Sequence, residues 1–405
     1  MIYHRWKTAV NALAWLPAAV LIFVQAVSGM RDMPQMAFFL IYLQERLGLA
    51  TGVISAVVAG SQLASMAAGL LGGALVARLG SKRVLLAGLA LSALASLAFQ
   101  APWFWLVSLL WFLGGVGMAL ITVGNASYLT QIGGRGGLGM LAAFYALSMT
   151  IGGALGNPAA GLLIERSGFV VFSWGVIALS ALIILVVALA MPSFNPGAAA
   201  AAAPSPDFWA GIRAAMRRPN MPLLVGMRSL PTIYYGMLTV LIPLLINALS
   251  GSKVVVAAYG TTTLVVASAA QLLAGRAADR WGARLPAAAA YCVLIISGAG
   301  LALGGGALWG LFAFGVLGNA AAWSLSTLMY VWVNDGVPRA AHPAAFGLLH
   351  AVWSLSMITG SMLGGWFAAA HPGPVFLAGG LLNSAAIFFL FRYYRPGRLP
   401  LEASA

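Results

Sequence analysis

Residues 169–190 read FVVFSWGVIALSALIILVVALA, an apolar run without a single charged side chain. As an α-helix, a run of about 20 residues spans the ~30 Å hydrocarbon core of a bilayer. Only helices and closed β-barrels satisfy every backbone group in lipid, and a barrel strand alternates polar and apolar residues. Residues 176–190 show no such alternation. The run is therefore predicted to be a transmembrane helix.

The whole chain has the composition of this run. Of its 405 residues, 62% are hydrophobic and 7% are charged, whereas soluble domains have roughly 25% charged residues. Arg5 and Lys7 precede the first apolar run, which continues without a small-residue cleavage site and is interpreted as a retained helix rather than a signal peptide. The one cysteine, Cys292, lies in an apolar block, so neither a disulfide within the chain nor a thiolate metal cluster is expected.

Twelve such runs divide the chain into two sets of six. The predicted helices cover residues 17–43, 51–77, 84–99, 103–128, 138–164, 169–190, 223–249, 254–278, 285–303, 308–333, 344–370 and 375–393. Between the sets lies a segment with Pro204 and Pro206, followed by a basic amphipathic piece at 207–218 that is interpreted as a connector helix lying on the membrane. The prediction is an all-α membrane protein with an N-terminal six-helix bundle (1–190), a cytoplasmic linker (191–222) and a C-terminal bundle with a short cytoplasmic tail (223–405).

Lys and Arg residues are distributed asymmetrically between the two sides of this arrangement. If both termini are cytoplasmic, the outer loops hold only Arg46, Arg166 and Lys253. The cytoplasmic segments hold Arg5, Lys7, Arg78, Lys82, Arg83, Arg135, Arg213, Arg217, Arg218, Arg276, Arg280, Arg284, Arg339, Arg392, Arg395 and Arg398. Because cytoplasmic loops carry the excess of positive charge, this orientation in a bacterial inner membrane is predicted. The net charge of +14 is thereby explained without a nucleic-acid partner.

The two halves repeat each other in sequence. Residues 29–34 (GMRDMP) align with 226–231 (GMRSLP), and residues 73–80 (GALVARLG) align with 275–282 (GRAADRWG). The repeats run in parallel, an arrangement found in one large class of transporters.

The second repeat resembles the major facilitator superfamily signature G-x-x-x-D-R-x-G-R-R/K. The first copy has Gly73, Arg78, Gly80, Lys82 and Arg83 but Ala77 in place of the acidic residue, and the second copy has Gly275, Asp279, Arg280 and Gly282. The resemblance implies a monomeric permease of two six-helix bundles related by a pseudo-twofold axis. It also implies that these loops hold the halves in the outward-facing state through charge contacts at a helix end.

The fifth predicted helix carries small residues at close spacing. Gly152, Gly156, Pro158 and Gly161 resemble a motif found mainly in exporters of this family, and close helix packing alone is the alternative. In the fourth helix Trp111 stands where proton antiporters of the family have an Arg, which disfavours ordinary drug:proton antiport.

Three charged residues fall within predicted membrane helices. Arg31 and Asp32 lie near the middle of the first helix, and Arg228 lies at the corresponding depth of the seventh. Such charges are costly in lipid and usually face a cavity or a partner. The resemblance implies that these two helices line the central path, where two guanidinium groups would bind a carboxylate, phosphate or sulfonate.

Asp32 is expected not to neutralise Arg31 directly, because adjacent helix residues point about 100° apart. It is expected instead to pair with Arg228 or a neighbouring helix, or to carry the coupling proton. A purely structural network of the three charges is the alternative. Other candidates for the cavity are Gln35, Gln62, Tyr145, Tyr234, Gln271, Asn319, Trp323 and His350, and the imidazole of His350 can carry a proton near neutral pH.

The leading hypothesis is a secondary active transporter of a small organic solute, coupled to protons and favouring anions. The alternative is a multidrug-type proton antiporter for cationic or neutral amphiphiles, and a more distant one is a sensor or assembly protein that does not transport. The sequence has no nucleotide-binding loop and no H-E-x-x-H pair, and its histidines at 4, 342, 350 and 371 lack metal-ligand spacing. Neither an enzyme nor a cofactor is predicted.

Overall fold

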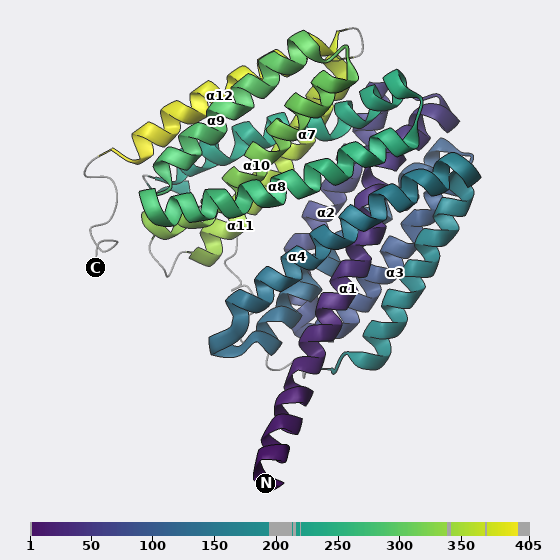
Figure 1. The fold of residues 1–405 in the computed structure, drawn as a ribbon, viewed down its shortest axis with the longest axis vertical. Helices are drawn as coiled ribbons and strands as arrows, with labels where there is room; N and C mark the ends of the chain where they lie inside the picture. Colours follow the sequence, from purple (N-terminus) through teal and green to yellow (C-terminus); the bar gives the residue numbers. More distant parts are fainter. Residues whose placement is uncertain are drawn as a thin grey trace. The chain divides into compact units, whose positions relative to one another are not determined.

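The computed structural model describes residues 2–193, 213, 216–218, 220–337, 342–368 and 371–395, and almost all of them are helical (Figure 1). In chain order the elements are α1 (Ile2–Leu47), α2 (Thr51–Leu79), α3 (Ser81–Ala95), the short 3₁₀ helix η1 (Ser96–Gln100), α4 (Phe104–Ala190), α7 (Met221–Ser250), α8 (Lys253–Trp281), α9 (Arg284–Gly304), α10 (Leu308–Gly336), α11 (His342–Phe367) and α12 (Pro372–Tyr393). The described part contains 11 helices that are long and apolar enough to cross a membrane. The predicted all-α membrane protein is confirmed.

Helix α4 has 87 residues and contains three passes rather than one. A straight helix would separate Leu163 from Gly175 by about 18 Å, yet a Cβ built at Gly175 would lie 3.6 Å from Leu163 Cδ2. The chain reverses at Gly168, whose φ of 80° favours glycine because L side chains rarely adopt it. Likewise, the Tyr128 hydroxyl donates to the carbonyl of Pro192 at 3.2 Å, which places the end of the first pass beside the end of the third.

The sequence therefore located these passes. It placed loops at 129–137 and 165–168, which the structure includes in α4, although the backbone of Gly168 has a non-helical φ. Residues 144–190 count as one of the 11 apolar helices, and the reversal at Gly168 divides them into two. This division is consistent with twelve passes.

The chain forms two compact units, one of residues 1–39 and 64–204 and the other of residues 40–63 and 205–405. Within the first unit, α1, α3 and α4 enclose an apolar core. The buried members of that core are Leu21, Val24, Val27, Leu85, Leu89, Ile121, Tyr128, Ile183, Val187 and Met191. Because these residues come from separate passes, the core fixes the passes against each other.

In the second unit, α7 packs against α10, α11 and α12, while α9 packs against α10 and α12. Figure 1 shows α9 and α12 side by side. The end of α1 and the first part of α2 belong to this unit. Lys253 pairs with Glu45 at 2.5 Å, and Asn247 donates to the same Glu45 oxygen at 2.8 Å. Trp366 of α11 packs on Gly52 at the start of α2.

Glycines allow the closest helix contacts in both units. A Cβ at Gly152 would overlap the carbonyl oxygen of Ala26, and one at Gly156 would overlap that of Met30. In the second unit a Cβ at Gly360 of α11 would overlap the carbonyl oxygen of Ile233 on α7. The glycines of the predicted motif thus bring α4 against α1, as small residues do in membrane helices. In the same segment Gly161 is buried and Pro158 is exposed.

The two signature loops also share a geometry. Gly80 and Gly282 follow the ends of α2 and α8 with φ values of 83° and 75°, a backbone that favours glycine. Of the other signature residues, Gly73 and Gly275 lie partly buried on these helices, and Arg78, Asp279 and Arg280 are exposed near the helix ends.

Basic residues two positions after these glycines contact later helices. Lys82 Nζ donates to the carbonyls of Ala188 and Met191 at 2.8 and 2.7 Å, at the C-terminus of α4. Arg284 lies over the ring of Phe391 on α12, with 4.5 Å from Cζ to the ring centroid. A cation at the carbonyl end of a helix interacts favourably with the helix dipole.

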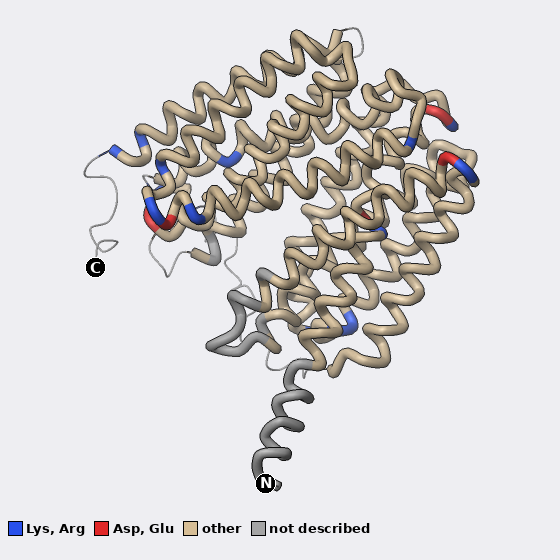
Figure 2. Tube along the Cα trace, viewed as in Figure 1, with Lys and Arg blue, Asp and Glu red and all other residues tan. Residues whose placement is uncertain are grey.

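Most described Lys, Arg, Asp and Glu residues lie near helix ends, and few lie part-way along a helix (Figure 2). This distribution is typical of helices that cross a bilayer. Most of the predicted amphipathic segment 207–218 lies outside the described residues, as do Arg339 and Arg398.

Candidate functional site

Arg31 and Asp32 form a buried ion pair within the first unit. Arg31 Nε donates to Asp32 Oδ1 at 2.7 Å, and Nη2 donates to Oδ2 at 3.1 Å. Arg31 is 0% exposed and Asp32 is 6% exposed. The expectation that Asp32 would not neutralise Arg31 is wrong. Although neighbouring Cβ atoms point apart, the long Arg side chain turns back and meets the carboxylate with two nitrogens.

A chain of hydrogen bonds extends from this pair. Arg31 Nη1 donates to Ser180 Oγ of α4 at 3.3 Å, and Gln35 Nε2 donates to the carbonyl of Arg31 at 3.1 Å. Ser96 Oγ of η1 in turn donates to Gln35 Oε1 at 3.3 Å. The first-half candidates Arg31, Asp32 and Gln35 are thus held together, and the network ties α1 to η1 and α4.

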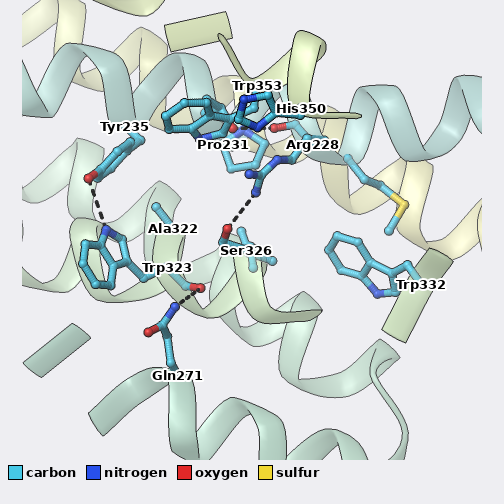
Figure 3. A pocket seen from close by; sticks show the side chains of 13 residues that line it. Arg228, Pro231, Tyr235, Gln271, Ala322, Trp323, Ser326, Trp332, His350 and Trp353 are labelled. Atoms are coloured by element: carbon cyan, nitrogen blue, oxygen red, sulfur yellow. Dashed lines mark hydrogen bonds between the residues drawn. The ribbon is translucent and has the colours of Figure 1, made fainter. Parts of the chain in front are cut away.

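A cavity of 320 Å³ lies inside the second unit (Figure 3). This volume is at the lower end of the roughly 300–1,000 Å³ typical of small-molecule sites. Helices α7, α8, α10 and α11 line the cavity, with the residues Met227, Arg228, Pro231, Thr232, Tyr235, Gln271, Ala322, Trp323, Leu325, Ser326, Trp332, His350 and Trp353.

Arg228 is the cation of this cavity. Its Nη1 donates to Ser326 Oγ at 3.0 Å, and its Nε has no hydrogen-bond partner among the described residues. Within the described part of the chain no carboxylate pairs with Arg228, in contrast to Arg31. Arg228 is partly buried, and a guanidinium removed from water without a counter-ion is costly. The charge and the unpaired donor favour binding of an anion from outside the chain.

Aromatic rings form much of the wall around Arg228. Trp323 Nε1 donates to the Tyr235 hydroxyl at 3.2 Å, and His350 stacks on Trp353 with 5.8 Å between ring centroids. Gln271 Nε2 donates to the carbonyl of Trp323 at 3.3 Å, so the cavity wall also carries an amide (Figure 3).

The structure brings together four of the residues singled out in the sequence, namely Arg228, His350, Gln271 and Trp323. Tyr234 and Asn319 lie elsewhere in the unit. The Tyr234 hydroxyl shares a hydrogen bond of 2.9 Å with Ser297 Oγ of α9. Asn319 Nδ2 donates to the Tyr259 hydroxyl at 3.0 Å. Both contacts connect helices away from the cavity.

Several lining residues were missed by the sequence analysis, although helix periodicity would have found them. Tyr235 lies seven residues after Arg228, Ser326 three after Trp323, and Trp353 three after His350. Residues at these spacings share one face of a helix. The charged or polar residue on each helix therefore predicts which neighbours line the same space.

Comparisons with known proteins agree with this architecture. The family model for the Major Facilitator Superfamily matches residues 21–330 and, in a second match, 235–404. No curated protein matches the sequence. Among solved structures, a mutant of the nucleoside transporter NupG is similar with a TM-score of 0.78 and 16% identity, over 94% of this chain and 100% of that one. The NupG structure without this mutation gives 0.76 and 16%, over 95% and 99%. At this identity the likeness shows the fold alone.

Proposed function

Because the chain belongs to the major facilitator superfamily and is a multi-pass membrane transporter rather than an enzyme, we propose that it moves a small organic anion. In this proposal Arg228 binds the anionic group of the solute, and transport is driven by a proton gradient. The transporter acts as a monomer in a bacterial inner membrane with both termini in the cytoplasm. The asymmetric distribution of Lys and Arg between predicted loops supports this orientation.

The anion assignment rests on the surroundings of Arg228, which lines the cavity without a counter-ion among the described residues. Its guanidinium lines a cavity, has an unpartnered Nε, and pairs with no carboxylate of the described residues. A carboxylate or phosphate group bound in the cavity would supply the missing counter-charge. Arg31 is not assigned to the solute anion, because its guanidinium is already paired with the carboxylate of Asp32. The anion proposal therefore rests on one cation, Arg228, rather than on two.

Proton coupling is assigned to Asp32, with His350 as the alternative group. Protonation of Asp32 would remove its charge and so weaken its bond with Arg31, which links proton uptake to the packing of α1 against α4. His350 lines the same cavity as Arg228, where a proton on its ring would add a second positive charge beside the anion.

The predicted division into bundles 1–190 and 223–405, joined by the cytoplasmic linker 191–222, is part of the proposal. The signature loops would then stabilise one conformation of the transporter. The bonds of Lys82 to the C-terminus of α4 support this role, because this cation, two residues after Gly80 in the first turn of α3, contacts the carbonyl end of another pass.

Nucleoside transport is a second candidate. The similar solved structures are described as a nucleoside transporter. The lining also combines the Gln271 amide with the Trp323 ring, a set that suits a flat heterocycle with polar edges. Export of cationic amphiphiles receives less support, because the cavity carries an unpaired cation and the described carboxylates do not line it.

The test uses purified protein in liposomes with a pH-sensitive dye inside. Organic anions, nucleosides and organic cations are added in turn, and solute-driven proton movement is recorded for the wild type, Asp32→Asn and His350→Gln. Proton movement with anions alone, lost in one of the two variants, is expected. A response only to cationic amphiphiles would contradict the proposal, and a response only to nucleosides would favour the second candidate.

A further inference from the structure

We propose that the anion bound at Arg228 is carried on a planar aromatic or heteroaromatic ring. This inference rests on the proposed function and names the substrate class of the same cavity. Five of the residues that line the cavity carry aromatic rings: Tyr235, Trp323, Trp332, His350 and Trp353. These residues belong to α7, α10 and α11, and Figure 3 shows their rings around the guanidinium.

The rings are held in place before any solute binds. Trp323 and Tyr235 are joined by the hydrogen bond of 3.2 Å between the indole nitrogen and the hydroxyl. His350 and Trp353 stack with an angle of 21° between their planes. Fixed rings present flat faces at little entropic cost on binding. They therefore favour a flat solute over a puckered one of equal size.

Trp332 carries a second unpartnered donor. It is 1% exposed, and its Nε1 has no hydrogen-bond partner among the described residues. Buried indole N–H groups usually find a partner. Figure 3 shows this nitrogen on the edge of the indole that is turned away from Arg228. Trp332 therefore contributes an apolar ring to the wall next to the guanidinium rather than a donor.

Aliphatic surface is limited in this cavity. The lining contains Leu325 as its one branched aliphatic residue, beside Met227, Pro231 and Ala322. A site for a fatty or saturated ring acid would bury such a solute mainly against branched aliphatic side chains. Aromatic stacking adds to area burial by an amount that corresponds to about two- to tenfold in affinity for each good contact.

The experiment compares matched acids that differ in aromaticity alone. Benzoate and cyclohexanecarboxylate have the same carboxylate and the same ring size, and phenylacetate and cyclohexylacetate form a second pair. Binding of each acid to the purified full-length protein is measured by isothermal titration calorimetry. We expect the aromatic member of each pair to bind at least about threefold more tightly.

Two variants of Trp353 test whether the preference for aromatic acids comes from the aromatic side chains that line the cavity. Trp353→Leu is expected to weaken binding of benzoate about two- to tenfold and to leave cyclohexanecarboxylate unchanged, while Trp353→Phe retains most of the preference. Trp309→Leu is the matched control, because Trp309 is exposed and does not line the cavity. A loss in Trp309→Leu equal to that in Trp353→Leu would overturn the assignment.

The outcomes separate this inference from the function on which it rests. Equal affinity for the two members of each pair, with binding lost in Arg228→Gln, would overturn the aromatic class and leave the anion site intact. Absence of binding by all four acids, or binding that is unchanged in Arg228→Gln, would overturn the anion site and the aromatic class together.

Discussion

Removal of the charge on Asp32 tests the contribution of the buried Arg31–Asp32 ion pair to the stability of the protein. Asp32→Asn keeps the size of the side chain but leaves the guanidinium of Arg31, which is 0% exposed, without its counter-charge. Of the two hydrogen bonds of the pair, at 2.7 and 3.1 Å, at most one can survive, because the Asn amide has a single acceptor oxygen and its NH₂ group would face a guanidinium donor. Breaking a buried pair by removal of one partner costs about 3–5 kcal/mol, so we expect a loss of this size in unfolding free energy.

The assay is reversible unfolding of the purified protein in mixed micelles by SDS, with a double-mutant cycle. Arg31→Gln combined with Asp32→Asn removes both charges, and we expect the double variant to recover at least half of the loss seen in Asp32→Asn. Asp279→Asn is the control, since Asp279 is exposed near the end of α8 and should change stability by less than about 0.5 kcal/mol. If Asp32→Asn is as stable as this control and the cycle is additive, the reasoning about the buried pair is refuted.

Three further predictions concern packing and helix ends, and thermal unfolding in detergent measures each of them. Gly152→Ala should lower the unfolding free energy by about 1–3 kcal/mol or more, because the new Cβ overlaps a backbone carbonyl. Gly60→Ala is the control: a Cβ there would have no atom within 4 Å, so this variant should be neutral or slightly more stable. Equal effects of the two substitutions would contradict this packing. Lys82→Met should cost about 0.5–1.5 kcal/mol through its two carbonyl contacts, and an unchanged melting temperature would argue against that role. Lys253→Met should cost no more than about 1 kcal/mol because its partner Glu45 has a side chain that is 37% exposed; a larger loss would show that this pair is more strongly coupled than its exposure suggests.

The sequence was sufficient to predict the class of fold because the signals were long and repeated. Apolar runs located the membrane passes to within a few residues at most ends, as in the predicted 285–303 against α9 (Arg284–Gly304). The signature glycines Gly80 and Gly282 marked helix ends in both halves, where their positive φ values explain the residue type. The predicted breaks at 129–137 and 165–168 located the reversals inside α4, but they did not reveal that most of these residues have helical backbone.

The candidate site was only partly predictable, because the reach of long side chains and the rotation of each helix about its axis determine which residues come into contact. Adjacent residues of a helix point about 100° apart, so an ion pair between Arg31 and Asp32 was not expected. The flexible Arg side chain nevertheless reaches the neighbouring carboxylate. Tyr234 was chosen for the cavity, but the neighbouring Tyr235 lines it. A difference of one residue rotates a side chain to another face of α7, and the seven-residue spacing from Arg228 places Tyr235, not Tyr234, on the face of that cation.

The most direct test of the central claim is counterflow of labelled benzoate in proteoliposomes containing the wild type, Arg228→Lys or Arg228→Gln. Arg392→Gln serves as the control, because Arg392 is exposed at the end of α12. We expect an apparent Kd at least about tenfold higher in Arg228→Gln, the loss expected for one hydrogen bond to a charged group. We also expect partial recovery in Arg228→Lys, which restores the charge but not the fork of donors. Counterflow in Arg228→Gln with the affinity of the wild type would contradict the claim that Arg228 binds the transported anion.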